Sequence, residues 1–356
     1  NVGIMANEKK GRKLIFALIL FSILYRIIAN KMLKPELHLI PEWTIDINSV
    51  SKDAGGTPLA YRLGQNIGYF TADGKIISHI PYPVKATITD SRYSTFGFDS
   101  QSADFYSPDG SLYGSINEKG FPFFKDDRMF AFLPGGTSFA ALDSSGGRIF
   151  TYDYFAPITA FDSCPTACVA GYADGTLISF LSDGTVDQKF APGGSDIEVI
   201  LGAAISPDGS MIACICGQNQ QRFLISKKNE GTINGKITWH EYLPDSFNAQ
   251  TLVQFNKAGD KVFYNYKGGL GIVDLLKNDS SHVPIEGQII QIQESSDLLF
   301  ILSRNQDEYT LTGIELFDHP ILKFSFKAES SFIRTLDDAL FIGRDEKISR
   351  LTISRK

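Results

Sequence analysis

Short hydrophobic runs separated by tight-turn residues are the feature that most constrains the fold of this chain. In AISPDGSMIACICG, residues 204–217, Pro207 fixes φ and cannot donate to a strand ladder, and Asp208-Gly209 favours a tight reversal. After Ile40 such runs follow the two-residue period of strands, and no helical period extends beyond two turns. Further Asp-Gly pairs stand at residues 73–74, 109–110, 174–175 and 183–184. The sequence therefore predicts a succession of β-hairpins.

The hairpins recur at a spacing that suits one all-β architecture. Eight hairpins begin near residues 66, 103, 137, 166, 210, 261, 297 and 339, about 39 residues apart on average. Each is preceded by another hydrophobic strand, as at 251–256, and is usually followed by a further one, as at 236–243. Four strands per repeat predict an all-β β-propeller of about eight four-stranded blades. The interval between the third and fourth hairpins is short, so seven blades are the alternative.

The two ends of the repeat region are complementary. The last hairpin lacks a fourth strand, and a single strand pattern, ELHLIPEWTIDI, occupies residues 36–47. A ring left open would expose two sheet edges. We therefore expect residues 36–356 to form the propeller, with the strand at 36–47 joining the last blade and closing the ring.

The N-terminal segment differs from the repeats. KKGRKLIFALILFSILYRIIANK places a basic cluster before an apolar run. Between Leu14 and Ala29, 11 Leu, Ile or Phe residues contribute about −5 kcal/mol to membrane insertion, and Arg26 opposes it by at most about 3 kcal/mol. We expect a basic tail at 1–13, a transmembrane signal anchor at 14–30 and a linker at 31–35. A cleaved signal peptide, for which no small-x-small site is present, and a buried amphipathic helix are the alternatives.

Charge restricts the location and the partners of the propeller. Four Lys or Arg residues precede the apolar run and three lie in it or just after it, which favours a propeller outside the cytoplasm. The first 34 residues hold seven of the 34 basic and one of the 40 acidic residues, so the remaining body carries a net charge near −12. Because such a body repels phosphate backbones, no nucleic-acid partner is expected.

Two repeat segments resemble known bacterial propellers. ISPDGSMIA and YADGTLISF are similar to the repeats of the TolB, YVTN and quinoprotein-like (PQQ-like) groups, which implies a WD40-like propeller fold but no particular chemistry. The chain lacks the Trp-Asp dipeptide of typical WD40 repeats, the recurring Trp of quinoprotein blades and an adjacent Cys-Cys pair. The eight-bladed lipoprotein scaffold that assists outer-membrane protein assembly is a structural analogue, although no Cys follows the apolar run here.

Motifs for catalysis or for cofactors are absent from the sequence. No Gly-x-Ser-x-Gly elbow, phosphate-binding loop or Asp-x-Asp-x-Asp-Gly calcium loop occurs, and the Asp of each Asp-Gly pair is interpreted as a turn residue. The five histidines show no metal-ligand spacing and are interpreted as solvated or strand-face residues: His38, His79, His240, His282 and His319. We therefore expect no catalytic residue, no cofactor and no metal site.

The four cysteines form two close pairs. Cys164 and Cys168, in SCPTAC, are spaced to close a small disulfide in an oxidising compartment. Cys214 and Cys216 alternate on one strand, so we expect them to share a face and pack as small apolar residues. Neither pair has the Cys-x-x-Cys spacing of a zinc site.

Two irregular segments make the fifth repeat the longest. They are SKKNEGTINGK at 226–236 and LPDSFNAQ at 243–250. Long propeller loops commonly contact partners, and an insertion without a binding role is the alternative.

These observations lead to one function and one alternative. We expect a single-pass inner-membrane protein whose periplasmic propeller is a scaffold for protein–protein interactions with envelope or membrane proteins, and not an enzyme. The alternative is a small-ligand sensor or an enzyme that uses the central channel. That function requires clustered polar residues on the innermost strands, and the strands assigned there carry mostly Ala, Ser, Gly, Phe and Ile.

Overall fold

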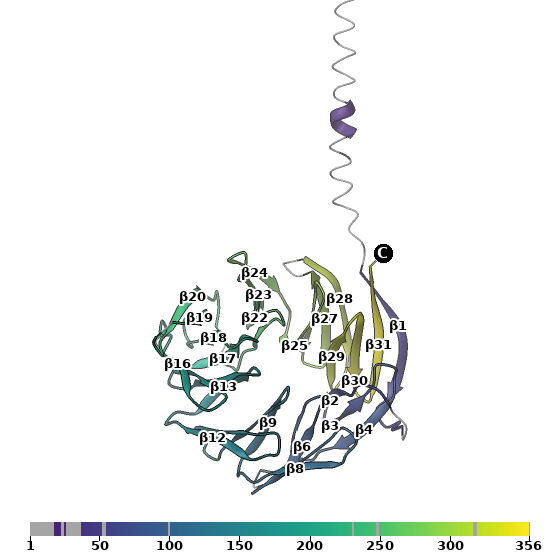
Figure 1. Cartoon of the computed structure of the whole chain (residues 1–356). Helices are drawn as coiled ribbons and strands as arrows, with labels where there is room; N and C mark the ends of the chain where they lie inside the picture. Colours follow the sequence, from purple (N-terminus) through teal and green to yellow (C-terminus); the bar gives the residue numbers. More distant parts are fainter. Residues whose placement is uncertain are drawn as a thin grey trace, which may run out of the picture. The chain divides into compact units, whose positions relative to one another are not determined.

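The computed structural model describes residues 18–22, 25, 37–51, 55–98, 100–229, 231–246, 249–315 and 319–355. The chain divides into two compact units, one at Pro41–Thr352 and one that comprises the chain up to Ile40 and from Ile353. The first unit is an all-β propeller of eight sheets, so the predicted fold class and the number of blades are confirmed (Figure 1). The alternative of seven blades is wrong.

The blades are numbered here in chain order, each from its innermost strand outward. Blade 1 contains β2 (Leu59–Leu63), β3 (Asn66–Phe70) and β4 (Ile76–Pro81). Blade 2 contains β5 (Lys85–Ile88), β6 (Tyr93–Phe96), β7 (Ala103–Tyr106) and β8 (Leu112–Ile116). Blade 3 contains β9 (Phe121–Lys125), β10 (Arg128–Phe132), β11 (Ser138–Leu142) and β12 (Arg148–Asp153). Blade 4 contains β13 (Ile158–Ser163), β14 (Ala167–Tyr172), β15 (Leu177–Leu181) and β16 (Val186–Phe190).

The second half of the ring follows the same plan. Blade 5 contains β17 (Ile200–Ile205), β18 (Met211–Cys216), β19 (Arg222–Lys228) and β20 (Gly235–Tyr242). Blade 6 contains β21 (Val253–Phe255), β22 (Lys261–Tyr266), β23 (Gly269–Asp274) and β24 (Asp279–Pro284). Blade 7 contains β25 (Gln288–Ser295), β26 (Leu298–Asn305), β27 (Glu308–Glu315) and β28 (His319–Lys327). Blade 8 contains β29 (Ser331–Leu336), β30 (Ala339–Arg344), β31 (Lys347–Arg355) and β1 (Leu37–Asp46).

Burial changes from the middle strands of a blade to its outer strand. Every residue of β14, β22 and β23 is buried, whereas β12 and β20 are exposed along much of their length. A middle strand has strand neighbours at both edges and packed blades on both faces, so small or apolar residues are needed throughout. Clusters of buried side chains join blades 1 and 2, 2 and 3, 3 and 4, 4 and 5, 5 and 6, 6 and 7, and 8 and 1.

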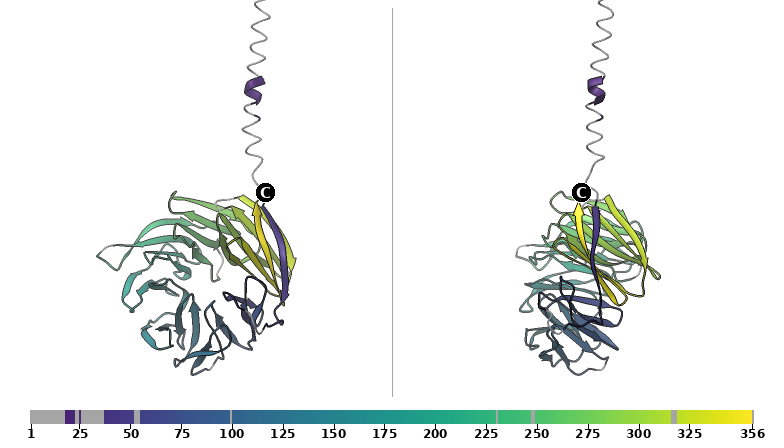
Figure 2. Two further views of the ribbon diagram at one scale, coloured as in Figure 1. Left: turned by 45° about the vertical axis from the view of Figure 1, so that its right-hand side comes forward. Right: turned by 90° about the vertical axis from the view of Figure 1, so that its right-hand side faces the viewer.

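The last blade takes its outer strand from the N-terminal side of the propeller. β1 is the neighbour of β31 in the sheet order, which is the place that the sequence analysis assigned to residues 36–47 (Figure 2). Within the propeller unit, Thr44 Oγ1 lies 2.9 Å from Ser349 Oγ, and Thr352 Oγ1 donates a 2.9 Å hydrogen bond to Glu42. These contacts tie blade 8 to a segment about 300 residues earlier in the chain.

The predicted hairpins do not occupy equivalent positions in their blades. The first three join the last two strands of blades 1 to 3, and the other five join the second and third strands of blades 4 to 8. The position of the hairpin within its blade therefore shifts by one strand between the third and fourth hairpins. This change explains the short interval there without any loss of a blade.

The N-terminal predictions fall mostly outside the described residues. Residues 18–22 and Tyr25 are helical, and the rest of the proposed anchor at 14–30 lies outside them, as do the tail at 1–13 and the linker at 31–35. Among the residues that the structure describes, no helix has the length and apolar character needed to cross a membrane.

Candidate functional site in the central channel

Two cavities open between the innermost strands of the propeller. The larger, of about 610 Å³, is lined by residues on or just after β2, β5, β9, β25 and β29. The smaller, of about 450 Å³, is lined by residues on or next to β9, β13, β17, β21 and β25. Both include Lys125, Asp126 and Gln293, so they are two halves of one central channel.

Polar side chains on the innermost strands link several neighbouring blades. Gln291 Oε1 on β25 accepts a 2.8 Å hydrogen bond from the Ile333 N–H on β29, and Gln293 Oε1 accepts a 3.4 Å bond from the Thr335 N–H. The residue numbers rise together on the two strands, so β25 and β29 run parallel. Similar bonds join Phe124 N–H to Thr87 Oγ1 and Ile205 N–H to Asp162 Oδ2. These side chains satisfy backbone groups that no strand of the same blade can reach.

An ion pair links blades 3 and 4 in the smaller cavity. Lys125 on β9 contacts the carboxylate of Asp162 on β13, and the Asp162 side chain is only 13% exposed. Burial raises the pKa of Asp162 above its usual value, because the charged form loses hydration, and the ammonium of Lys125 opposes that effect. The pair is therefore an interblade contact with a costly buried charge.

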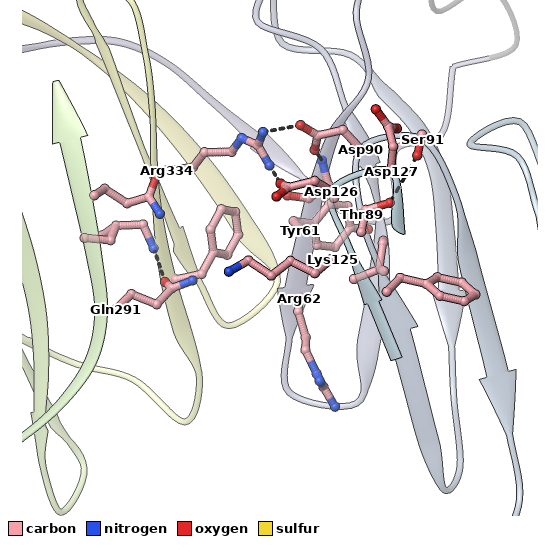
Figure 3. Close-up of a pocket in the computed structure, with 16 residues that line it drawn as sticks. Tyr61, Arg62, Thr89, Asp90, Ser91, Lys125, Asp126, Asp127, Gln291 and Arg334 are labelled. Atoms are coloured by element: carbon pink, nitrogen blue, oxygen red, sulfur yellow. Dashed lines mark hydrogen bonds and ion pairs between the residues drawn. The ribbon is translucent and has the colours of Figure 1, made fainter. Parts of the chain in front are cut away.

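A second ion pair crosses the larger cavity from blade 8 to blade 2. Arg334 on β29 contacts the carboxylate of Asp90, which follows β5 (Figure 3). Asp90 Oδ1 also accepts a 2.9 Å hydrogen bond from the Ala60 N–H of β2, and Arg334 Nη1 lies 3.5 Å from the Ala60 carbonyl. Both polar backbone groups of Ala60 are thus satisfied by side chains of other blades.

β2 runs in the opposite direction to its neighbours around the channel. A β-carbon on Gly64, after the end of β2, would lie 3.6 Å from Ser330 Oγ, just before the start of β29. Ala60, near the start of β2, contacts Arg334 farther along β29. The Ala60 contact with Asp90 likewise places the start of β2 beside the end of β5. β2 is therefore antiparallel to both β29 and β5.

A shared Tyr–Gly–His motif explains this reversal. In blades 1 and 6 a Tyr is paired across the sheet with a Gly, and that Gly is paired with a His on the next strand. The spacings of seven and 11 residues are identical: Tyr61, Gly68 and His79 on β2, β3 and β4; Tyr264, Gly271 and His282 on β22, β23 and β24. β2 therefore corresponds to the second strand of blade 6.

Blade 1 accordingly has no described counterpart of β21, the innermost strand of blade 6. Seven sheets contain four strands, and blade 1 contains three. At its outer edge, Val50 forms an isolated bridge to Ile76. The larger cavity lies at the inner edge of β2, where an innermost strand would otherwise lie. The open half of the channel is thus a consequence of one absent strand.

Two carboxylates beside the larger cavity have no partner among the described residues. Asp126 and Asp127 form the turn after β9, both are exposed, and Asp126 adopts a φ of +50°.

The aspartates of the Asp-Gly turns behave differently, because Asp109, Asp183 and Asp208 each accept a hydrogen bond from the backbone N–H two residues later. Their predicted role as turn residues is confirmed.

The channel lining differs from the one expected from sequence. The innermost strands do carry many Ala, Ser, Gly, Phe and Ile residues, as expected, but the expectation missed the polar side chains among them. Strands that line the channel carry Arg62, Lys125, Asp162, Gln291, Gln293, Glu294 and Arg334. The polar lining that a ligand-binding channel requires is therefore present.

The cysteines are buried and free in this structure. Cys164 lines the smaller cavity, with its sulfur 3.6 Å from Thr166 Oγ1, and Cys168 lies on β14. A disulfide between Cys164 and Cys168 stays a prediction. Cys214 and Cys216 pack in the apolar cluster of blades 4 and 5, which confirms the interpretation of that pair.

Two histidines have partners that the sequence analysis missed. The Tyr61 hydroxyl lies 3.2 Å from His79 Nδ1. In blade 6 the Tyr264 hydroxyl donates to Glu241 of β20 and lies 3.0 Å from His282 Nε2. Burial and the hydrogen bond to Glu241 raise the pKa of Tyr264, so its hydroxyl stays protonated. The repeated Tyr-x6-Gly-x10-His spacing was the available signal.

The first irregular segment of blade 5 packs against blade 4. Lys189 N–H donates a 2.7 Å hydrogen bond to the Ile233 carbonyl, and Lys228 forms an ion pair with Asp187. These contacts give residues 226–236 an interblade structural role. In the second segment, Asp245 forms an exposed 2.9 Å ion pair with Lys267.

Among the described residues, no group of three or more His, Cys, Asp or Glu side chains is placed to hold a metal ion. His240 is exposed on β20, and His38 and His319 lie on β1 and β28. The absence of metal and cofactor sites stays an expectation.

Comparisons with known proteins agree with the architecture. Residues 5–356 match the model of a family described as beta-propeller protein. A protein of Treponema pallidum (strain Nichols), described only as uncharacterized, is 27% identical over 362 residues that cover 98% of this chain and 95% of the relative.

Solved propellers resemble the chain at low sequence identity. BamB from Moraxella catarrhalis is 9% identical with a TM-score of 0.61, and 88% of this chain and 100% of that one are covered. Sqt1 of Saccharomyces cerevisiae is 10% identical with a TM-score of 0.62, and the Dos1 propeller is 12% identical with a TM-score of 0.58. They cover 91% and 88% of this chain, and 100% and 95% of their own. These likenesses show the fold, and the match over residues 5–356 shows that the chain belongs to the beta-propeller protein family.

Proposed function

We propose that this chain is a membrane-anchored scaffold whose propeller binds other proteins in the bacterial cell envelope. The fold is consistent with a protein-interaction scaffold, and BamB from Moraxella catarrhalis has the same fold. The apolar sequence at 14–30 supports an anchor in the inner membrane, with the propeller on the periplasmic side. Envelope or membrane proteins are the partners that this location offers.

The observation that carries protein binding is the larger cavity beside blade 1. It has a volume of about 610 Å³, a largely polar lining and a strand edge at β2. Hydrogen bonds between blades, such as that from the Ile333 N–H to Gln291, hold its walls, so the cavity is preformed. A preformed polar cavity in a rigid ring binds a partner without a large cost of ordering.

A pull-down of the tagged full chain from its native host, in mild detergent and after crosslinking, tests this proposal. Mass spectrometry would identify the proteins that co-purify. A full-chain variant with Leu20→Arg and Phe21→Asp in the apolar run is the control for anchoring. We expect envelope proteins to be retained by both forms, and membrane association to be lost in the variant. Purification of both forms without partners would contradict the scaffold.

A small ligand in the channel is the second candidate function. It is favoured by the charged lining, in which Asp126 and Asp127 have no partner in the described part of the chain. Native mass spectrometry of the protein purified from its host would reveal a bound small molecule as added mass. We expect an Asp126→Asn, Asp127→Asn variant to lose the bound molecule. If the variant retained it, the ligand site would lie outside this part of the channel.

A further inference from the structure

We propose that the inner edge of β2 accepts an extended peptide strand of a partner protein, which completes blade 1 inside the larger cavity. The proposal rests on the scaffold function and specifies how the partner binds. The incoming strand takes the position that β21 holds in blade 6, and it runs antiparallel to β2.

The pairing of β2 with β3 determines which backbone groups face the cavity. A two-residue turn, Gly64-Gln65, joins the strands, so Leu63 and Asn66 form a hydrogen-bonded pair beside it. Such pairs alternate along an antiparallel ladder, and Tyr61 therefore also bonds to β3. Ala60 and Arg62 direct their N–H and C=O groups to the opposite edge, which faces the cavity.

At this edge, side chains bond to the backbone groups of Ala60 that an innermost strand would otherwise bond to. The Ala60 N–H donates to Asp90, and the Ala60 C=O accepts from Arg334, as a neighbouring strand would bond to both groups. The substitution is imperfect, because Arg334 Nε is buried without a hydrogen-bond partner in the described residues. The Asp90 side chain is 46% exposed, and an ion pair this accessible contributes little to stability. An incoming strand can therefore displace it at little cost.

The dimensions of the cavity suit a short strand. Strands rise about 3.3 Å per residue, so four or five residues extend roughly 15 Å along β2. β2 itself has five residues. The preformed volume of about 610 Å³ lies beside this edge, and Lys125, Gln291 and Arg334 border it (Figure 3).

Charge specifies the chemistry of the incoming strand. Asp126 and Asp127 lie at one end of the cavity without partners, whereas Lys125 and Arg334 are already paired with carboxylates. Arg62 is directed away from this cluster, and its Nε donates a 2.9 Å hydrogen bond to Tyr82 (Figure 3). The uncompensated charge is negative. The partner strand therefore carries Lys or Arg near the turn after β9.

Peptide binding to the full chain tests the proposal. The probe is a fluorescent peptide of alternating Lys and Val residues, measured by anisotropy up to about 1 mM. One comparison peptide has the same sequence with every backbone amide N-methylated, and another has Glu in place of Lys. We expect the first peptide to bind and each comparison peptide to bind at least about tenfold more weakly. N-methylation leaves charge unchanged, so equal binding of the methylated peptide would overturn strand pairing.

Two variants locate the binding. Ala60→Pro removes an N–H that faces the cavity and makes no bond to β3, so the sheet is retained while the new strand loses a partner. Asp126→Asn, Asp127→Asn removes the unpaired charges. Its matched control is Asp337→Asn, Asp338→Asn in the corresponding turn of blade 8, where Asp337 has the same φ of +50°. We expect at least about tenfold weaker binding for the first two and unchanged binding for the control.

The outcomes separate this proposal from the scaffold itself. If the Lys-Val peptide does not bind, or binds the Asp337→Asn, Asp338→Asn control as weakly as the Asp126→Asn, Asp127→Asn variant, the strand site is wrong. The pull-down is then repeated with Ala60→Pro, or with Asp126→Asn, Asp127→Asn if the proline variant does not fold. If that variant still retains partners, the scaffold function stands and the partners bind another surface of the propeller. Partners absent from the unmodified chain as well would contradict the scaffold.

Discussion

Blades 1 and 6 are built from the same three-strand unit, and they differ in what lies on its inner side. Both place a Tyr over a Gly and a His beyond it, and both end their outer strand on Ser-His-Ile-Pro or Ser-His-Val-Pro. Blade 6 adds β21 and is complete, whereas blade 1 leaves the edge of β2 at a cavity. The same three outer strands therefore occur with and without an innermost strand, and the cavity lies where that strand is absent.

The largest expected effect tests whether the shared motif packs alike in both blades. A β-carbon on Gly271 would lie 1.9 Å from the Tyr264 ring, and one on Gly68 would lie 2.1 Å from the Ser78 carbonyl. We expect Gly271→Ala and Gly68→Ala each to lower the free energy of unfolding by about 3 kcal/mol. Urea unfolding measures this change.

Gly55→Ala is the matched control for this prediction. A β-carbon on Gly55 meets no atom within 4 Å, and its φ is not positive. We expect a change within about 0.5 kcal/mol. If the three variants were equally stable, the Tyr–Gly packing would not support the correspondence between the blades.

The next effect concerns the smaller cavity of the channel, where Asp162 is buried. Its pKa is raised by burial, so the protonated carboxyl favours the folded state, and that contribution is lost as the pH rises through the folded-state pKa. Asp162→Asn stays neutral at every pH. We expect the stability of the unmodified protein, relative to this variant, to fall between about pH 4 and pH 7. Urea unfolding across this range measures it, and a rise would contradict the assigned direction.

An outer turn is expected to show the opposite sign and a smaller effect. Asp143 accepts hydrogen bonds from Ser145 Oγ at 2.6 Å, Gly147 N–H at 2.9 Å and Ser145 N–H at 2.8 Å, which lower its pKa. Its contribution to stability is present above the unfolded-state pKa and is lost on acidification. Relative to Asp143→Asn, the unmodified protein should lose stability as the pH falls from about 4 to 2. If the unmodified protein and Asp143→Asn lost the same stability on acidification, the hydrogen bonds of Asp143 would not stabilise the fold.

The smallest effect is expected at the open half of the channel. Asp126 and Asp127 have no hydrogen bond or ion pair among the described residues, so Asp126→Asn, Asp127→Asn should change the free energy of unfolding by no more than about 0.5 kcal/mol. Thermal unfolding of the variant checks this. A larger loss would mean that these carboxylates hold the turn and are not kept for a partner.

The sequence predicted the propeller because its turns carry local signals. Asp-Gly pairs and the two-residue period depend on nearby residues, so they identified hairpins in all eight blades. The place of the first three hairpins within their blades was missed, because a hairpin of middle strands and one of outer strands have similar local patterns. The sequence also did not reveal that Lys125, Asp162 and Arg334 line the channel, because they lie on innermost strands outside the hairpins that the local signals identify.

The incomplete blade was predictable only in part. The repeated spacing of Tyr61, Gly68 and His79 was visible in the sequence, whereas the reversal of β2 depends on contacts with β5 and β29 that are distant along the chain. The contact of residues 226–236 with blade 4 was likewise not accessible, because it joins backbone groups at Lys189 and Ile233.

Amide hydrogen exchange of two neighbouring residues tests the central claim most directly. The Tyr61 N–H bonds to β3, and the Arg62 N–H faces the cavity, so nuclear magnetic resonance of the full chain compares an open edge with a closed one. The account predicts strong protection at Tyr61, rapid exchange at Arg62, and slower exchange at Arg62 when the Lys-Val peptide is added. Equal protection of both amides in the protein alone would show that the edge is already paired and would contradict the account.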